Sequence, residues 1–378
     1  MVRVEIKPEL WDWAVERAGA RGAELYKSFP NLRDWRTGSA RPTLKQVEAF
    51  AKAAFVPIGY LLLASPPLEP PPVPDLRTIG GRGPRRPSPD LLDTIYLCQH
   101  RQAWYRDHAQ IIGEDPRDFV GSARLTSSPG RIAERMRSRL GFNLQIQQRC
   151  RSWSEALRKL ILAAEEIGVL VMVSGVVGGN SHRVLDPEEF RGFALSDRFA
   201  PLIFINGADA KSAQMFTVAH EIAHLWLGHS ALSSVDPSPS EAVESWCNRV
   251  AAEFLVPSTE LRQSLGESDP LDCVQVLAQR FRVSSLVILR RLLDAGMTTR
   301  ETFQTAYDTE IAQSLERRRP GGGNFYKTQS ARLSPRFARA IITSTLEGQT
   351  LYRDAYHLLG VRKHQTFEKL ARSLRVLA

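Results

Sequence analysis

The five residues His220-Glu221-Ile222-Ala223-His224 constrain the fold of this chain more than any other feature, because they lie inside an apolar segment. Apolar residues recur at helical spacing from Ala213 to Leu225, and Asp209 is a plausible N-cap, which together predict an α-helix. Two histidines four residues apart on a helix lie on the same face, one turn above the other. Bare imidazoles buried in such a helix would be costly, so the pattern indicates that both bind a common group.

Metal binding is the chemistry that this spacing allows. His220 and His224 can reach one ion, and Glu221 can hydrogen-bond a water on that ion without being a ligand. Zinc lowers the pKa of such a water toward ~7, a carboxylate takes its proton, and the metal polarises a peptide carbonyl. The alternative is two surface histidines, which the apolar surroundings make less favourable. We therefore predict zinc ligands at His220 and His224 and a general base at Glu221.

A catalytic zinc site needs a third protein ligand. The metzincin spacing, with a glycine three residues and a histidine six residues after the motif, is excluded because Leu227 and Ser230 hold those positions. On the next expected helix, Glu244 shares a face with small side chains that would let two helices approach. Glu253 lies about 180° away and is expected to point to solvent. Glu244 is the predicted ligand, with Glu241 as a substitute and a surface role for Glu244 as the alternative.

Three apolar segments with strand character precede the motif, at residues 169–173, 192–195 and 202–205, with turn residues between them. Strands that follow one another without intervening helices suggest an antiparallel sheet. Helices are expected on both sides of this stretch, at 91–108 and 153–167 among others. The predicted fold class is therefore α+β, with a small antiparallel sheet between helical regions.

Proline- and glycine-rich stretches divide the chain. Residues 66–89 cannot hold a helix or a central strand and are predicted to be a linker. Residues 1–65 show the spacing of an all-α bundle of short helices. A second break at Arg317 to Gly323 separates the domain with the sheet, residues 90–316, from a C-terminal helical segment at 317–378.

The net charge of +9 is unevenly distributed. Residues 1–87 hold 14 basic and 9 acidic residues, and residues 317–378 hold 13 and 3, which leaves a mildly acidic centre. Affinity for DNA or an acidic partner should therefore reside in the ends, although solvated Arg-rich helices are an equal alternative. We expect no membrane association and a cytoplasmic location, because the sequence shows neither a long apolar run nor a secretory signal.

Within residues 7–63, the pattern includes Leu32, Trp35, Gly38 and the segment 41–47, Arg-Pro-Thr-Leu-Lys-Gln-Val, in which Thr43 is the expected N-cap. With this pattern, residues 7–63 resemble a helix-turn-helix domain of the lambda-repressor/XRE kind.

This resemblance implies DNA binding. Arg33, Arg36 and Arg41 could meet phosphates, and Asn31 could read a base edge. Phe29-Pro30 falls where the turn should be, however, and residues 30–37 allow at most two helical turns. A protein-docking module that has lost DNA readout is therefore the alternative.

The basic tail has helical spacing at 337–346, 351–359 and 366–374. The segment from Asp354 to Val361, followed by basic residues, is weakly similar to a helix-turn-helix. A helical lid docked on the preceding domain is the alternative.

The segment from Arg191 through Leu225, which includes Gln-Met-Phe-Thr-Val-Ala-His-Glu-Ile-Ala-His-Leu, resembles the ImmA/IrrE metallopeptidases. So does the segment from Glu244 to Pro257, where that family pairs a helical glutamate with a downstream Asn, Ala-Ala and Pro. The resemblance covers about 155–315 and implies a zincin-like fold in which His220, His224 and Glu244 bind zinc and Glu221 is the base. Better-understood members cut helix-turn-helix repressors and so switch on stress or mobile-element genes.

The leading hypothesis is a regulatory, gluzincin-like zinc peptidase that cleaves one or a few proteins, with a transcriptional repressor as the expected substrate. The peptide would lie extended along a strand edge near residues 192–205. One rival is a DNA-binding transcriptional regulator whose zinc centre is a sensor or a structural unit. Another is an antitoxin-like binding module.

Overall fold

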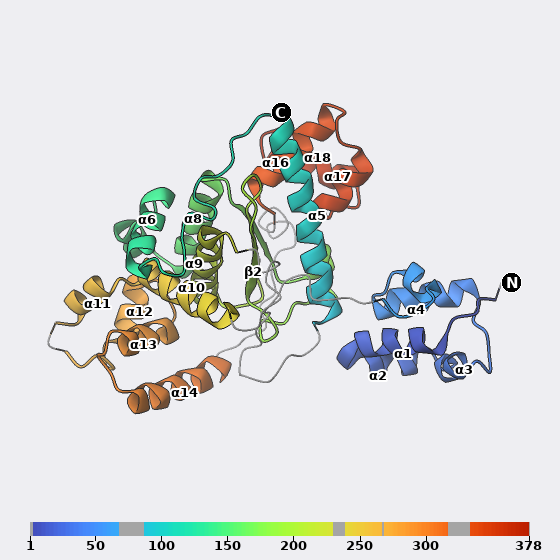
Figure 1. Ribbon diagram of the computed structural model, residues 1–378, viewed down its shortest axis with the longest axis horizontal. Helices are drawn as coiled ribbons and strands as arrows, with labels where there is room; N and C mark the ends of the chain where they lie inside the picture. Colours follow the sequence, from blue (N-terminus) through green and yellow to red (C-terminus); the bar gives the residue numbers. More distant parts are fainter. Residues whose placement is uncertain (1–2, 68–86, 230–238, 267, 317–332, 378) are drawn as a thin grey trace. The chain divides into compact units, whose positions relative to one another are not determined.

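The computed structural model describes residues 3–67, 87–229, 239–266, 268–316 and 333–377. The chain forms two compact units: the first holds the N-terminal helices and the start of α5 up to Ile95, and the second continues from Tyr96 (Figure 1). Among the helices in these ranges, none combines the length and the apolar composition that crossing a lipid bilayer requires.

The first unit is helical and has its own core. Trp11 is fully buried, and its ring centroid lies 5.4 Å from that of Trp35 and 4.8 Å from that of Phe50. These rings join three helices that are each too short to be stable alone. The elements are α1 (Pro8–Arg17), η1 (Gly19–Arg21), α2 (Gly22–Ser28), α3 (Leu32–Thr37), α4 (Leu44–Ala54) and η2 (Ile58–Leu62).

The predicted N-cap of α4 is confirmed. The Thr43 side chain accepts a hydrogen bond from the Gln46 backbone N–H, and the Gln46 side chain accepts one from the Thr43 backbone N–H, which forms a capping box. The predicted shortness of the preceding helix is also observed, because α3 has only six residues.

The sheet of the second unit is mixed, so the predicted antiparallel sheet is wrong in part. Its strands are β1 (Leu170–Ser174), β2 (Gly192–Leu195) and β3 (Leu202–Asn206), in the order β1-β3-β2. β2 and β3 are antiparallel, as expected for strands joined by a short connection, whereas β1 and β3 are parallel. The segment 175–191, which contains η3 (Val177–Gly179), joins the end of β1 to the start of β2 at the same end of the sheet, and β3 lies between these two strands.

Helices cover both faces of the sheet (Figure 1). Alternate strand residues, including Val171 and Ile203, share a buried core with residues of α8 and α9. On the other face, Arg101 of α5 contacts the Met172 sulfur, and Gln102 of α5 donates to the carbonyls of Leu195 and Ala200. The sheet is thus the middle layer, and α9 and α5 lie on opposite faces.

The helices that surround the sheet, and those that follow it, make up most of the second unit. Those before residue 317 are α5 (Pro89–Ile111), α6 (Pro129–Leu140), α7 (Leu144–Arg149), α8 (Trp153–Glu166), α9 (Lys211–Leu227), α10 (Pro239–Leu255), α11 (Ser258–Leu265), α12 (Val274–Phe281), α13 (Ser285–Asp294) and α14 (Arg300–Glu316).

The three tail helices predicted from the sequence are observed as α16 (Pro335–Leu346), α17 (Tyr352–Leu359) and α18 (His364–Ser373). They dock on α5 and α8. The buried Glu165 carboxylate, from the end of α8, accepts hydrogen bonds from the Ser334 hydroxyl and the Arg336 N–H at the start of α16. Trp104 of α5 packs edge-on against Phe337. The tail therefore lies against α5, on the sheet face opposite α9.

Candidate metal centre

The motif helix α9 is buried between the sheet, α8 and α10, which explains its apolar composition. It begins at Lys211 with Ala210 as the N-cap, so the prediction of Asp209 as the cap is wrong. The Asp209 carboxylate instead accepts the Ala210 N–H and lies 3.5 Å from the Arg191 guanidinium. A local hydrogen bond to the next residue thus replaces the expected cap.

The C-terminal end of α9 is held by the loop around Gly121. The Gly121 N–H donates to the Leu225 carbonyl at 3.1 Å, and the Ala123 N–H donates to the Trp226 carbonyl at 2.8 Å. Gly228 ends the helix with φ +69°, and a Cβ there would lie 2.7 Å from the Gly121 Cα. These contacts satisfy helix-end carbonyls and fix the last turn, which carries His224.

α10 packs along α9 and presents Glu244 to the two histidines. Cys247 and Ala251 are fully buried on α10, and their small side chains let the two helices approach, as predicted. The prediction that Glu253 points to solvent is wrong: its carboxylate accepts hydrogen bonds from Arg291 and from the Ser258 hydroxyl. The side chain of Glu241 lies outside the described residues.

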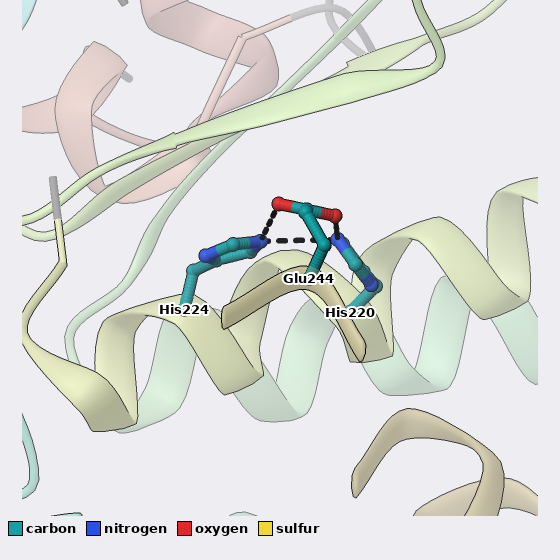
Figure 2. Close-up of side chains that lie close together, drawn as sticks. All are labelled: His220, His224 and Glu244. Carbon is teal, nitrogen blue, oxygen red and sulfur yellow. Dashed lines mark hydrogen bonds and ion pairs between the residues drawn. The ribbon is translucent and has the colours of Figure 1, made fainter. Parts of the chain in front are cut away.

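The three predicted ligands converge, as Figure 2 shows. His220 Nε2 and His224 Nε2 are 3.0 Å apart, and the Glu244 carboxylate oxygens lie 3.1 Å from the first and 3.0 Å from the second. In the described part of the chain, this is the His/Cys/Asp/Glu group that could hold a metal ion.

The donor set fits zinc. Ligand atoms around a tetrahedral zinc with bonds of about 2.0–2.2 Å lie roughly 3.3 Å apart, close to the separations seen between these three side chains. Two imidazole nitrogens and a carboxylate all present lone pairs to one point, which is unfavourable unless a proton or a cation is shared there. Two histidines and one glutamate are also the ligand set of known catalytic zinc sites that keep an open position.

Burial and mutual contact shift the pKa values of the site. Burial lowers the pKa of His224. Burial also acts to lower the pKa of His220, but the hydrogen bond to Glu244 and nearby carboxylate charges raise it overall. Burial acts to raise the pKa of Glu244, but its hydrogen bonds to both histidines hold that pKa well below the usual range.

Glu221 differs from Glu244, because burial raises its pKa to about 8. The site thus pairs a carboxyl group whose pKa is lowered, Glu244, with one whose pKa is raised, Glu221. Such a division suits one carboxylate as a ligand and the other as a proton carrier.

Gly192 is a neighbour of the site that the sequence alone did not reveal. It begins β2, an edge strand, and a Cβ there would lie 2.6 Å from Thr217 Cγ2, 2.7 Å from the Phe204 carbonyl oxygen and 3.1 Å from Glu221 Oε1. The Glu221 carboxylate therefore lies directly against the start of the edge strand. A glycine at a strand start is only a weak sequence signal for such a close approach.

The four predicted DNA-binding residues do not share one environment. Arg36 is half-buried and pairs within its own unit with Asp12 and the Tyr26 hydroxyl. Arg33 is exposed on α3, and Arg41 is exposed and 3.0 Å from Glu5.

Asn31 and Arg41 line an open groove of about 910 Å³ in the first unit, between the start of α3 and the start of α4. Its other lining residues include Arg3, Lys45 and the rings of Phe29 and Trp35. The groove therefore combines cationic side chains with aromatic surface.

Two family models match the chain. The model of the IrrE N-terminal-like domain, Peptidase_M78, matches residues 164–293, which contain the three strands, α9, α10 and all four site residues. A domain of unknown function, DUF8813, matches residues 333–373, which contain α16, α17 and α18. No curated protein matches the chain. Residues 164–293 are therefore similar to the IrrE N-terminal-like domain, and this similarity supports a domain of the ImmA/IrrE type.

Proposed function

We propose that this chain is a zinc-dependent endopeptidase that cleaves a peptide bond in a specific protein partner. The observation that carries the proposal is the convergence of His220, His224 and Glu244, whose ligand atoms lie within 4.8 Å of one another, beside the buried carboxylate of Glu221. When bound, zinc would polarise the substrate carbonyl and lower the pKa of a water.

The residues of this chain supply the proton transfers. Glu221 would take a proton from the attacking water and give it to the leaving amine. Burial raises the pKa of Glu221, which makes its carboxylate a stronger proton acceptor than a solvent-exposed one. Glu244, with its lowered pKa, would stay ionised as a ligand.

The substrate would bind as an extended segment along β2. This strand pairs with β3 on one side and is one of the two outer strands of the sheet. The outer edge of such a strand offers backbone N–H and C=O groups for pairing with a peptide. Because the Glu221 carboxylate lies where a Cβ at Gly192 would meet it, a peptide paired with β2 there would place a carbonyl near the site.

We further propose that the substrate is a helix-turn-helix transcriptional repressor in the cytoplasm. Support comes from the first unit, whose sequence resembles an XRE domain and whose groove of cationic and aromatic residues could hold a protein segment, and from the regulatory role of the family that residues 155–315 resemble.

Comparison of the zinc-loaded wild type with Glu221→Gln tests the proposal. Both proteins would be incubated with an extract of the source cells, and new protein N-termini would be identified by mass spectrometry. We expect new N-termini in one or a few proteins with the wild type and none with the variant. Identical N-termini in both samples, or none in either, would overturn the proposal.

DNA-binding regulation is the second candidate function, because Asn31, Arg33 and Arg41 are exposed on the first unit. It predicts operator binding that weakens steeply with salt and is unchanged in Glu221→Gln.

A further inference from the structure

Helices α17 and α18 form a helix-turn-helix pair. Residues 360–363 join them, and Gly360 ends α17 in the left-handed region at φ +68°. Val361 in the turn is buried, as are Ala355 and Leu359 of α17 and Phe367 of α18. A connection of three or four residues with a glycine is typical of this motif.

Hydrogen bonds and ring contacts fix the second helix against the first. The Tyr356 hydroxyl and His364 Nδ1 are 2.8 Å apart, which ties the start of α18 to the last turns of α17. The Phe367 ring lies 5.5 Å from Tyr352 and 5.7 Å from Tyr356, measured between centroids. The pair therefore has a defined geometry.

The outward surface of this pair is basic. Gln365, Lys369 and Arg372 are exposed and lie on one face of α18, at spacings of four and three residues. Arg362 and Lys363 are exposed in the turn immediately before it. Residues 360–378 hold five basic residues and one acidic residue, Glu368, which lies 3.4 Å from His364.

Two other short helix pairs in the described ranges use the cations of their second helix differently. In α12–α13, the buried Arg291 is bound to Glu253, and Arg290 is bound to Asp294. Both cations of the second helix therefore form ion pairs within the domain. In the first unit, α3 has six residues, and Arg36 is paired internally. α18 is longer than α3, and its basic side chains are exposed.

We propose that α17 and α18 bind double-stranded DNA, with α18 in the major groove and the basic turn on the phosphate backbone. The major groove admits an α-helix, and the second helix of a helix-turn-helix lies in it. Arg362, Lys363 and Arg372 would contact phosphates, and Gln365, in the first turn of α18, is placed to meet a base edge.

The pair is anchored to the second unit. Arg101 of α5, which is buried, donates from Nε to the Leu358 carbonyl in the last turn of α17 at 2.9 Å. Glu165 and Arg336 fix the start of α16. DNA bound by α18 would therefore be held by the unit that carries the candidate metal centre. This inference does not depend on peptidase activity.

Three double variants of the full-length protein test the inference. Lys363→Gln with Arg372→Gln alters the proposed surface. Arg131→Gln with Arg135→Gln removes the same charge from exposed positions on α6. Arg33→Gln with Arg41→Gln alters the first unit. Binding to a fluorescent 30-base-pair duplex would be measured by anisotropy across a range of salt concentrations.

We expect the first variant to bind about tenfold or more weakly at low salt, with the slope of log affinity against log salt reduced by about two. The α6 variant should bind within about twofold of the wild type, because only long-range charge is lost. Wild-type-like binding by the first variant, equal weakening in the α6 variant, loss confined to the variant of the first unit, or no binding by the wild type would each overturn the proposal. Circular dichroism would verify that the variants are folded.

Discussion

At the scale of single residues, the space between β2 and Glu221 is set by Gly192. Any larger side chain would meet Thr217, the Phe204 carbonyl and the Glu221 carboxylate at less than ordinary contact distance. The backbone carbonyl cannot yield without disturbing the β2–β3 pair, so the helix side chains would have to move.

Gly192→Ala should therefore reduce proteolysis about tenfold or more, because a small displacement of a proton-transfer group is costly for rate. We expect a loss of about 1–3 kcal/mol of folding stability from overpacking and a normal zinc content. Cleavage rate, urea unfolding and elemental analysis would measure the three effects. Gly130→Ala is the matched control, since a Cβ at Gly130 meets nothing within 4 Å. Full activity in Gly192→Ala would contradict the placement of Glu221.

The sequence predicts the position of a side chain well where its contacts are local in the chain, and poorly where its partner is distant in the chain. The spacing of His220 and His224, and the face of α10 that carries Glu244, follow from helical periodicity. Glu253 could not be placed in the same way, because Arg291 comes from a helix much later in the chain. Gly192 was missed for the same reason, since its contact with Glu221 crosses from strand to helix.

At the scale of elements, Glu165 joins α8, β1 and α16. Its carboxylate accepts hydrogen bonds from the Val171 N–H, the Ser334 hydroxyl and the Arg336 N–H. Burial raises its pKa to about 7, although these hydrogen bonds and the charge of Arg336 act to lower it.

This raised pKa predicts a pH-dependent stability. The folded protein binds the Glu165 proton more tightly than the unfolded chain. Protonated Glu165 therefore contributes to the free energy of unfolding, and this contribution is fully present below pH 4.5 and is lost as pH rises through 7. The loss amounts to at most about 3 kcal/mol. The free energy of unfolding, measured with urea from pH 4.5 to 8, should fall with rising pH in the wild type. In Glu165→Gln the part of this slope that comes from Glu165 should be absent.

Glu166→Gln provides the matched control, because the neighbouring Glu166 is exposed. It should keep the wild-type slope. An unchanged slope in Glu165→Gln would show that this carboxyl group does not gain proton affinity on folding.

The sheet shows what element-level patterns leave open. Apolar runs located all three strands, but periodicity does not specify which strands pair or in which direction. β1 pairs with β3 in parallel because the segment 175–191 joins β1 to β2 at one end of the sheet and β3 lies between these two strands. That segment has no regular periodicity, so its path depends on tertiary contacts such as the Leu185 N–H donating to the Gly175 carbonyl.

At the scale of the whole molecule, the two compact units have separate cores, and the candidate metal ligands lie in the second. Zinc should therefore stabilise the second unit alone. We expect calorimetry to show a transition that chelation shifts to lower temperature and one that it leaves unchanged. A free zinc concentration of 1,000 times the dissociation constant would stabilise the folded second unit by about 4 kcal/mol. Glu244→Ala should abolish the zinc-dependent shift. A shift of both transitions would contradict the claim that zinc stabilises the second unit alone.

Elemental analysis of the purified wild type, His224→Ala, Glu244→Ala and Glu221→Gln is the most direct test of the proposed centre. About one zinc per chain is expected in the wild type and in Glu221→Gln, with loss in both ligand variants, because three protein ligands hold the ion and Glu221 is not among them. No zinc in the wild type after reconstitution, or full zinc in Glu244→Ala, would contradict the three-ligand site.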